Sequence, residues 1–389
     1  MKNNFVTILD FGSGKITCMA ASKLSDNGEF IIKAVGQANY SGFDENGFFE
    51  PSMLESAVSQ AISQVEGKIK CDVKEIYVGV PGAFCSLLTS EASTTFHSRK
   101  KIDQDDIDEL VKKADIYKSG DDFAYLSGKP VYFILDGAIK TYDPLGAIAN
   151  KLTALVSFSF MKRAFRNTIA PILVDRGINR VNYINACEAQ AGYLSSFNMR
   201  EGYSIVIDIG YITTNVMLSG GKGLLFQRTF ALGSGYFASD LRLVIGCDFE
   251  HAMAALEKVN LNLEVKPGDA YSINGRAFEA SQTNGAVKER IAQIADYIIR
   301  SFQTCDKEIP ANTPIILTGG GLAYLRGGVD CLSQHLGKRV QLYTSVNPQT
   351  NRNEYTSSYG LIYEAITSNK NKNKGGFFSF LSKIGKGDK

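Results

Sequence analysis

The feature that most constrains the fold is a pair of similar segments that begin about half the chain apart. Residues 7–17 read TILDFGSGKIT and residues 205–215 read IVIDIGYITTN. Each segment has an apolar strand, an Asp-x-Gly turn and a second strand that contains threonine. Two such units favour an internally duplicated fold with a cleft between its halves, and the alternative is a chance likeness of two short strand–turn units.

The turns of these two units have the residue types that bind phosphate. Glycine leaves room for backbone N–H groups to approach a phosphate oxygen, and Lys15 adds a positive charge. Asp10 and Asp208, at the ends of facing strands, are expected to hold Mg²⁺ through its waters. A third glycine-rich turn, within residues 318–327, would let an adenine and its ribose lie against bare backbone. The candidate nucleotide-binding residues are Asp10, Gly12, Ser13, Gly14, Lys15, Asp208, Gly210, Thr213, Thr214, Gly233, Gly319, Gly320 and Gly321.

These motifs, in this order, resemble the actin/Hsp70/sugar-kinase superfamily and, within it, the bacterial FtsA family of cell-division proteins. The segments NACEAQAGYLSS and NEYTSSYGLIYEAI are similar to the superfamily's first connecting helix and closing helix. Residues 131–154, VYFILDGAIKTYDPLGAIANKLTA, resemble the small subdomain that is inserted in FtsA. The resemblance covers essentially the whole chain. It implies an α/β, duplicated actin-like (ribonuclease H-like) fold, with two lobes around a nucleotide cleft and the inserted subdomain.

The same resemblance implies a division of the chain into domains. We expect a first-lobe core, an inserted small subdomain, a second-lobe core with a small subdomain of its own, a linker and a terminal helix. The first-lobe core is expected at 1–83, 160–202 and 354–368, and the inserted small subdomain at 84–159. The second-lobe core is expected at 203–236 and 301–353, with its small subdomain at 237–300. The linker is expected at 369–376 and the terminal helix at 377–386.

The second turn departs from the superfamily pattern, which is Gly-Gly-Thr-Thr-Asp after the Asp-x-Gly. Tyr211 and Ile212 replace the two glycines, and Asn215 replaces the aspartate. In the helix EHAMAALEK, Met253 and Leu256 stand where FtsA has a glutamate and a lysine near the nucleotide. These changes predict weak or absent ATPase activity and leave open whether ATP binds at all.

Glu188 is the candidate catalytic residue. It matches the superfamily position that orients the attacking water, and the alternative is an exposed glutamate on a helix. Since the sequence shows no nucleophile–base pair, we do not expect group-transfer chemistry.

The C-terminal residues form an amphipathic pattern behind a lysine-rich spacer. On a helix, apolar side chains gather on one side and lysines on the other, as is typical of a helix in a membrane interface. The alternative is a helix that docks in a groove of this chain or of a partner. The chain's net charge is +2 and residues 369–389 carry +5, which leaves −3 for the rest and argues against a nucleic-acid partner. The candidate membrane residues are Phe377, Phe378, Phe380, Leu381, Lys383, Ile384 and Lys386.

Other features point to the reducing side of a membrane. The seven cysteines are scattered without a Cys-x-x-Cys pair, as expected of reduced cytosolic thiols rather than disulfides or a zinc site. No stretch approaches the ~18 apolar residues of a spanning helix, and the first residues lead directly into a strand, so we expect no secretory signal.

Together these features predict an actin-like protein that binds ATP and polymerises at the inner face of the cytoplasmic membrane. The FtsA resemblance further implies that residues 237–300 bind the C-terminal tail of FtsZ at the division septum, together with other divisome proteins. One alternative is a nucleotide-independent scaffold similar to the pilus-assembly protein PilM. A less favoured alternative is a relative of sugar or acid kinases.

Overall fold

The computed structural model describes residues 5–25, 28–116, 120, 122–195 and 202–372. Its first sheet has the order β11-β6-β1-β2-β3 and forms the core of the first lobe. β1 pairs antiparallel with β2, as the sequence predicts, and parallel with β6. Helix α1 covers this sheet with an apolar face that includes Leu54, Val58 and Ile62. The bounds are β1 Phe5–Phe11, β2 Lys15–Lys23, β3 Phe30–Asn39, β6 Glu75–Val80, β11 Arg180–Asn185 and α1 Pro51–Ile69.

The second lobe repeats this arrangement. Its sheet has the order β14-β13-β12-β17-β18, in which β12 pairs antiparallel with β13 and parallel with β17. β12 and β13 therefore correspond to β1 and β2, and the predicted duplicated actin-like fold is confirmed. The bounds are β12 Tyr203–Ile209, β13 Thr214–Gly220, β14 Gly223–Phe230, β17 Ile315–Thr318 and β18 Val340–Leu342.

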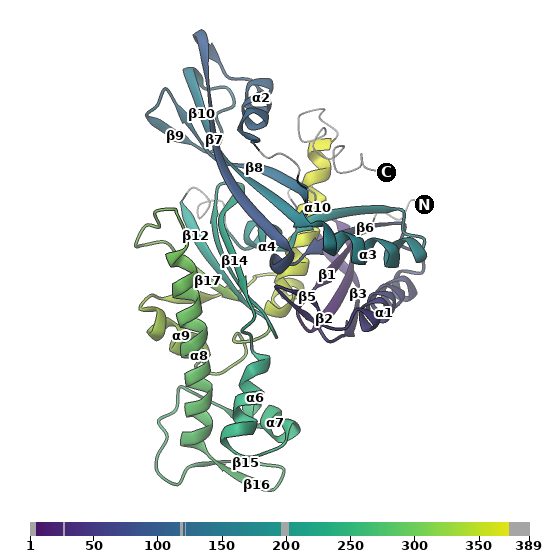
Figure 1. The fold of residues 1–389 in the computed structure, drawn as a ribbon, viewed down its shortest axis with the longest axis vertical. Coiled ribbons are helices and arrows are strands. Elements are labelled where there is room, and N and C mark those ends of the chain that lie inside the picture. The colour runs from purple at the N-terminus through teal and green to yellow at the C-terminus, as the bar shows by residue number, and fades with distance from the viewer. Residues whose placement is uncertain (1–4, 26–27, 117–119, 121, 196–201, 373–389) are drawn as a thin grey trace.

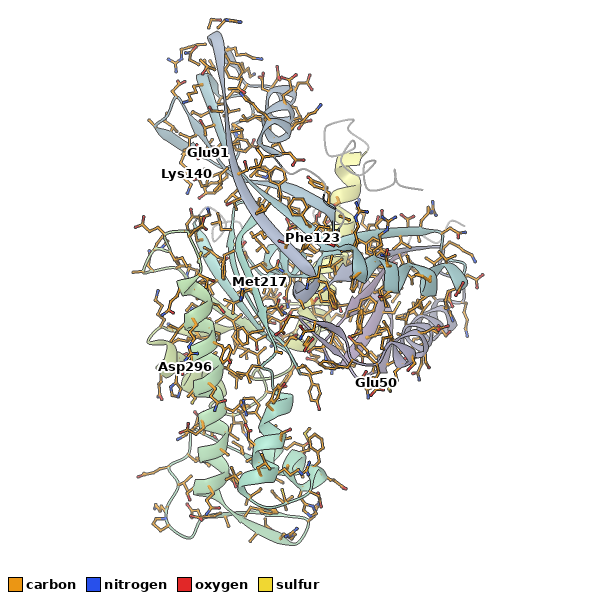
Figure 2. The ribbon with its side chains drawn as sticks, in the orientation of Figure 1. Glu50, Glu91, Phe123, Lys140, Met217 and Asp296 are labelled. Carbon is orange, nitrogen blue, oxygen red and sulfur yellow. The ribbon has the colours of Figure 1, made fainter. Side chains whose placement is uncertain are left out.

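A third sheet, of order β7-β10-β8-β9, extends from the first lobe between β6 and α3 (Arg163–Asp175). It carries α2, whose first turn has a capping box formed by Asp103 and Asp106. The sheet lies at one end of the long axis, where Figure 2 shows Glu91 and Lys140. The bounds are β7 Cys85–Lys101, β8 Phe123–Leu135, β9 Ile139–Thr141, β10 Ile148–Lys162 and α2 Gln104–Ala114.

The opposite end of the long axis is largely helical and belongs to the second lobe (Figure 1). Three helices and a two-stranded sheet share one hydrophobic core with the second-lobe sheet. Their bounds are α6 Gly235–Val244, α7 Phe249–Lys258, β15 Ala270–Ile273, β16 Arg276–Glu279 and α8 Ala280–Gln303.

Helices α4 (Ala186–Leu194) and α10 (Thr356–Lys372) pack against each other between the lobes. Two helix starts differ from those that the sequence pattern predicts. The helical spacing of residues 160–175 predicts a helix from Phe160, but Phe160 lies in β10 and α3 starts only at Arg163. The sequence also predicts a short helix that begins near Leu322, but this helix starts at Gly328, as α9 (Gly328–Leu336), because a turn follows β17.

Within the described residues, no helix has both the length and the apolar character needed to cross a membrane. The candidate membrane residues of the C-terminus lie outside the described residues. The structure does not test the proposed domain boundaries, which remain predictions.

Candidate functional site

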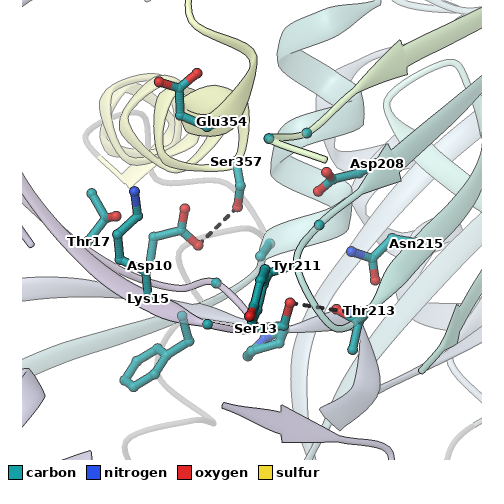
Figure 3. Close-up of a pocket in the computed structure, with 18 of the residues that line it drawn as sticks. Asp10, Ser13, Lys15, Thr17, Asp208, Tyr211, Thr213, Asn215, Glu354 and Ser357 are labelled. Carbon is teal, nitrogen blue, oxygen red and sulfur yellow. Dashed lines mark hydrogen bonds between the residues drawn. The ribbon is translucent and has the colours of Figure 1, made fainter. Parts of the chain in front are cut away.

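A cavity of about 610 Å³ lies between the two lobes, within the ~300–1,000 Å³ range of small-molecule sites. Asp10 and Asp208 both line it, so the expected meeting of the two Asp-led turns is confirmed. Figure 3 shows these two residues with Ser13, Lys15 and Thr213 around the same space. The candidate nucleotide-binding residues that line the cavity are Asp10, Gly12, Ser13, Gly14, Lys15, Asp208, Gly210, Thr213, Gly319 and Gly320.

Bare backbone forms part of the cavity wall. Gly319 has φ +96°, and a Cβ there would lie 2.3 Å from Oδ1 of Asp208, so only glycine lets the third turn approach β12. Within the described part of the chain, the backbone N–H groups of Ser13 and Gly14 donate to no other residue. Unpaired N–H groups beside a cavity suit an anion.

Asp10 stands at the end of β1 and is almost fully buried. Its Oδ1 accepts a hydrogen bond of 3.0 Å from Ser357, and its Oδ2 accepts one of 2.7 Å from Ser358. Burial raises the pKa of Asp10, and these two hydrogen bonds oppose the rise. The carboxylate is thus oriented by the first turns of α10.

Asp208 occupies the equivalent place at the end of β12. Its Oδ2 accepts a hydrogen bond of 3.0 Å from Nε2 of Gln190, on α4. Burial raises the pKa of Asp208 to about 6, although the Gln190 hydrogen bond opposes the rise and the charge of Asp10 adds to it.

The cavity carries more acidic than basic side chains. Among the described residues that line it, Lys15 is the only lysine or arginine, whereas Asp10, Asp208 and Glu354 are acidic. The ammonium of Lys15 lies 5.6 Å from the ring centre of Tyr355, a cation–π contact. A polyphosphate here would need a divalent cation to offset the carboxylates.

The second turn contacts the first turn directly. The Oγ of Ser13 accepts hydrogen bonds from the backbone N–H groups of Ile212, at 2.9 Å, and Thr213, at 3.2 Å. Figure 3 shows the hydrogen bond between Ser13 and Thr213. The ring of Tyr211 lies against Gly14 and lines the cavity, as does Asn215. Met253 and Leu256 belong to α7 and do not line it.

Three candidate residues lie behind the turns rather than in the cavity wall. The hydroxyl of Thr214 is buried and donates to the carbonyl of Leu232 at 2.7 Å. A Cβ on Gly233 would lie 2.5 Å from the Tyr211 carbonyl oxygen, and the N–H of Gly321 donates to the Ile209 carbonyl at 2.9 Å. These residues fix the backbone that surrounds the cavity.

Glu188 does not line the cavity either. Its Oε2 accepts hydrogen bonds from Ser127, at 2.7 Å, and Ser159, at 3.2 Å, and its Oε1 lies 3.4 Å from the ammonium of Lys129. The water-positioning role expected for Glu188 has no support in this geometry, in which its carboxylate joins α4 to β8 and β10.

Ser357, Ser358 and Gln190 are site residues that the sequence reasoning missed. The polar run Thr-Ser-Ser at the start of the closing helix is the only signal for the two serines. No group of three or more His, Cys, Asp or Glu that would enclose a metal ion occurs in the residues described.

Comparison with known proteins finds no matching family model. Curated relatives include "Cell division protein FtsA" of Streptococcus pneumoniae, 24% identical over 357 residues that cover 88% of this chain and 76% of the relative. The FtsA proteins of Enterococcus faecalis and Escherichia coli are 22% and 21% identical and cover 86% and 93% of this chain, and 77% and 90% of their own lengths.

Solved structures with the same fold include a PilM–PilN type IV pilus biogenesis complex, with TM-score 0.62, 15% identity, and coverage of 93% of this chain and 98% of that chain. MreB 5 of Spiroplasma citri bound to AMPPNP has TM-score 0.58 and 10% identity and covers 96% of this chain and 100% of its own. These likenesses establish the actin-like fold.

Proposed function

Because the chain is a divergent relative of the cell-division protein FtsA, we propose that it is an actin-like cell-division protein that acts as a membrane adaptor. It binds ATP in the cleft, polymerises, attaches to the cytoplasmic face of the membrane through residues 377–386 and tethers FtsZ at the septum. The observation that carries this proposal is the single cavity lined by both Asp-led turns in a chain that aligns with FtsA over most of its length.

The cavity residues fit a nucleotide with its metal. The free N–H groups of Ser13 and Gly14 and the ammonium of Lys15 would meet the phosphates, and the Gly319–Gly320 backbone would face the adenosine. Asp10 and Asp208 would hold Mg²⁺ through waters, which offsets the acidic wall. Bound ATP would supply contacts to both lobes at once.

The membrane step rests on the C-terminal sequence. A helix of about ten residues is marginal in water and binds a membrane weakly by itself. Many such helices on one polymer bind far more tightly through effective concentration. Polymerisation and membrane binding therefore reinforce each other.

The FtsZ tail is proposed to bind the subdomain of residues 237–300. Exposed apolar side chains on α6 and α7, among them Leu243, Phe249 and Met253, supply contact surface there. Leu243→Asp should weaken binding of an FtsZ C-terminal peptide, measured by fluorescence anisotropy. Leu145→Asp, at another exposed apolar position, in the segment between β9 and β10, is the control.

Co-sedimentation with anionic liposomes tests the whole proposal. The full chain should pellet with the liposomes and carry FtsZ into the pellet, whereas a chain without residues 376–389 should leave both in the supernatant. Equal pelleting by the two chains would exclude the membrane role of the C-terminus.

A nucleotide-independent scaffold, similar to PilM, remains the second candidate function. The observation that favours it is Tyr211 with Ile212, two large side chains in a turn where the superfamily places glycines. Equilibrium binding of labelled ATP with and without Mg²⁺ separates the two candidates, because the first binds ATP and the second does not.

A further inference from the structure

Three residues join the two lobes across the phosphate half of the cleft. Ser13 belongs to the first turn and Tyr211 and Ile212 to the second, so this cross-lobe cluster (Ser13, Tyr211 and Ile212) connects segments about 200 residues apart. Its contacts involve the backbone groups that the proposed nucleotide would need.

The hydroxyl oxygen of Ser13 accepts hydrogen bonds from two backbone N–H groups of the second turn. It accepts the N–H groups of Ile212 and Thr213 at 2.9 and 3.2 Å. Backbone N–H groups of such a turn are the ones that bind phosphate in a bare glycine turn. Because each N–H can point at one acceptor, a phosphate oxygen must displace the Ser13 hydroxyl.

The Tyr211 ring covers the glycine of the first turn. A Cβ built on Gly14 would lie 2.7 Å from its Cδ1, and one built on Gly235 would lie 2.9 Å from its Cε2. The ring thus lies between Gly14 and the start of α6, and 47% of the residue is still exposed. The backbone of Tyr211 is held at this place because its carbonyl accepts the N–H of Gly235 at 2.8 Å.

Ile212 extends the contact into the first lobe. A Cβ on Gly42 would lie 2.6 Å from Cδ1 of Ile212 and 2.1 Å from the Ser13 carbonyl oxygen. Gly42 has φ +92°, so glycine is needed there for its backbone as well as for the space. The first lobe therefore accommodates the Ile212 side chain closely.

We propose that the cross-lobe cluster holds the phosphate half of the cleft closed without a ligand and competes with the phosphates of a nucleoside triphosphate. The inference rests on the proposed nucleotide binding and specifies its regulation. A phosphate oxygen is a stronger acceptor than a serine hydroxyl, so the nucleotide can take the two N–H groups. The Tyr211 ring must first leave Gly14. The apparent affinity is therefore the intrinsic affinity multiplied by the fraction of molecules in which the ring has left.

The closed state also has a consequence for assembly. Since the chain's own side chains hold the lobes together, filaments on a membrane should form without nucleotide. A bound triphosphate then shifts the lobes away from the closed arrangement, and filament formation does not require it.

Equilibrium binding of ATP with Mg²⁺ to the full-length chain tests the competition. Tyr211→Ala frees Gly14 and keeps every backbone donor, so it should bind ATP at least about tenfold more tightly than the unaltered chain. Phe49→Ala, which removes an aromatic ring of similar exposure (49%) outside the cavity, should leave the affinity unchanged. Unchanged or weaker binding by Tyr211→Ala would overturn the proposal.

Hydrogen exchange of the nucleotide-free chain gives a second readout that does not depend on affinity. The amides of Ile212 and Thr213 should exchange slowly, and Ser13→Ala should accelerate both. Equal exchange in the two chains would show that Ser13 does not hold the turn. Co-sedimentation of the same variants with liposomes and FtsZ tests the adaptor function separately. Failure of the proposed competition can therefore be distinguished from failure of the proposed adaptor function.

Discussion

Lys129 lies between the buried carboxylate of Glu188 and the partly buried carboxylate of Glu364, and its removal should destabilise the protein strongly. Its ammonium is 3.4 Å from Oε1 of Glu188 and 2.9 Å from Oε1 of Glu364, and 17% of its side chain is exposed. These residues come from β8, α4 and α10, so one lysine joins three elements. In Lys129→Met the two glutamates face each other without a cation.

The expected cost follows from burial. The Glu188 side chain is only 3% exposed, and its Oε1 has no hydrogen-bond donor among the described residues. Leaving one member of a buried ion pair without its partner costs about 3–5 kcal/mol. For a chain of 389 residues the melting temperature should therefore fall by roughly 4–6 °C.

The cost should also depend on pH. In the unaltered chain, burial lowers the pKa of Lys129 but the two glutamates outweigh it, so the pKa is raised. For Glu364, burial acts to raise the pKa and Lys129 outweighs it, so the pKa is lowered. Without the lysine, one glutamate should protonate in the folded state with a raised pKa. The variant then loses stability as pH rises through that value, and its deficit should be larger at pH 8 than at pH 5.

Differential scanning fluorimetry across this pH range measures the effect. Arg99→Met, which breaks the exposed ion pair with Asp136, is the control and should change the melting temperature far less, because solvent screens an exposed pair. Adding Glu188→Gln to Lys129→Met should restore part of the stability. A Lys129→Met chain that melts within about 2 °C of the unaltered protein at pH 8 would refute the reasoning.

Two further substitutions probe the cleft and the interface between subdomains. Burial raises the folded-state pKa of Asp208 to about 6, so the folded state holds the proton of this carboxyl more tightly than the unfolded state. The protonated carboxyl therefore contributes to stability below pH ~4, and this contribution is lost as pH rises through about 6. Asp208→Asn should therefore stabilise the chain at pH 8 by about 2–3 kcal/mol and have little effect at pH 4, measured by urea unfolding; equal effects at both values would contradict the burial argument. Gly221 has φ +56°, and a Cβ there would lie 1.8 Å from the Val131 carbonyl oxygen, so Gly221→Ala should force β8 away from the β13–β14 turn. Gly177 has a similar φ of +71° but open space around a Cβ, so Gly177→Ala is the control and should destabilise the chain by ~1 kcal/mol. Gly221→Ala should cost several times as much. Similar melting temperatures for the two alanine variants would show that this turn does not fix the inserted sheet.

The two central hairpins were predictable because local signals agree at each of them. An apolar run ends at Asp10 or Asp208, an Asp-x-Gly turn follows, and a second apolar strand returns. Since both strands of a hairpin are close in sequence, no long-range information was needed to form them. The order of the motifs along the chain then led to the shared cleft.

The errors arose where distant pairing decided the structure. Phe160 has helical spacing with Ala164 and Phe165, yet its backbone pairs with Ser86 on β7 and Tyr125 on β8. That pairing holds Phe160 in a long strand regardless of its own spacing.

The residues that orient the two aspartates could not be predicted from the sequence either. Ser357 and Ser358 are almost 350 positions from Asp10, and Gln190 approaches Asp208 only because α4 packs against β13 and α10. A hydroxyl on a helix gives no sign of its acceptor until the helix is placed. The start of α9 was predicted too early for a local reason. The glycines after β17 begin a turn, and this turn ends only at Gly327, which has φ +79° and precedes the first residue of α9.

Electron microscopy of the full chain on anionic lipid monolayers tests the central claim most directly, because it reports polymer, membrane and nucleotide together. The account predicts filaments on the lipid that require residues 376–389 and that form both with and without ATP. Particles that stay single on the lipid under every nucleotide condition, or filaments that persist on it after removal of residues 376–389, would contradict a membrane-bound actin-like adaptor.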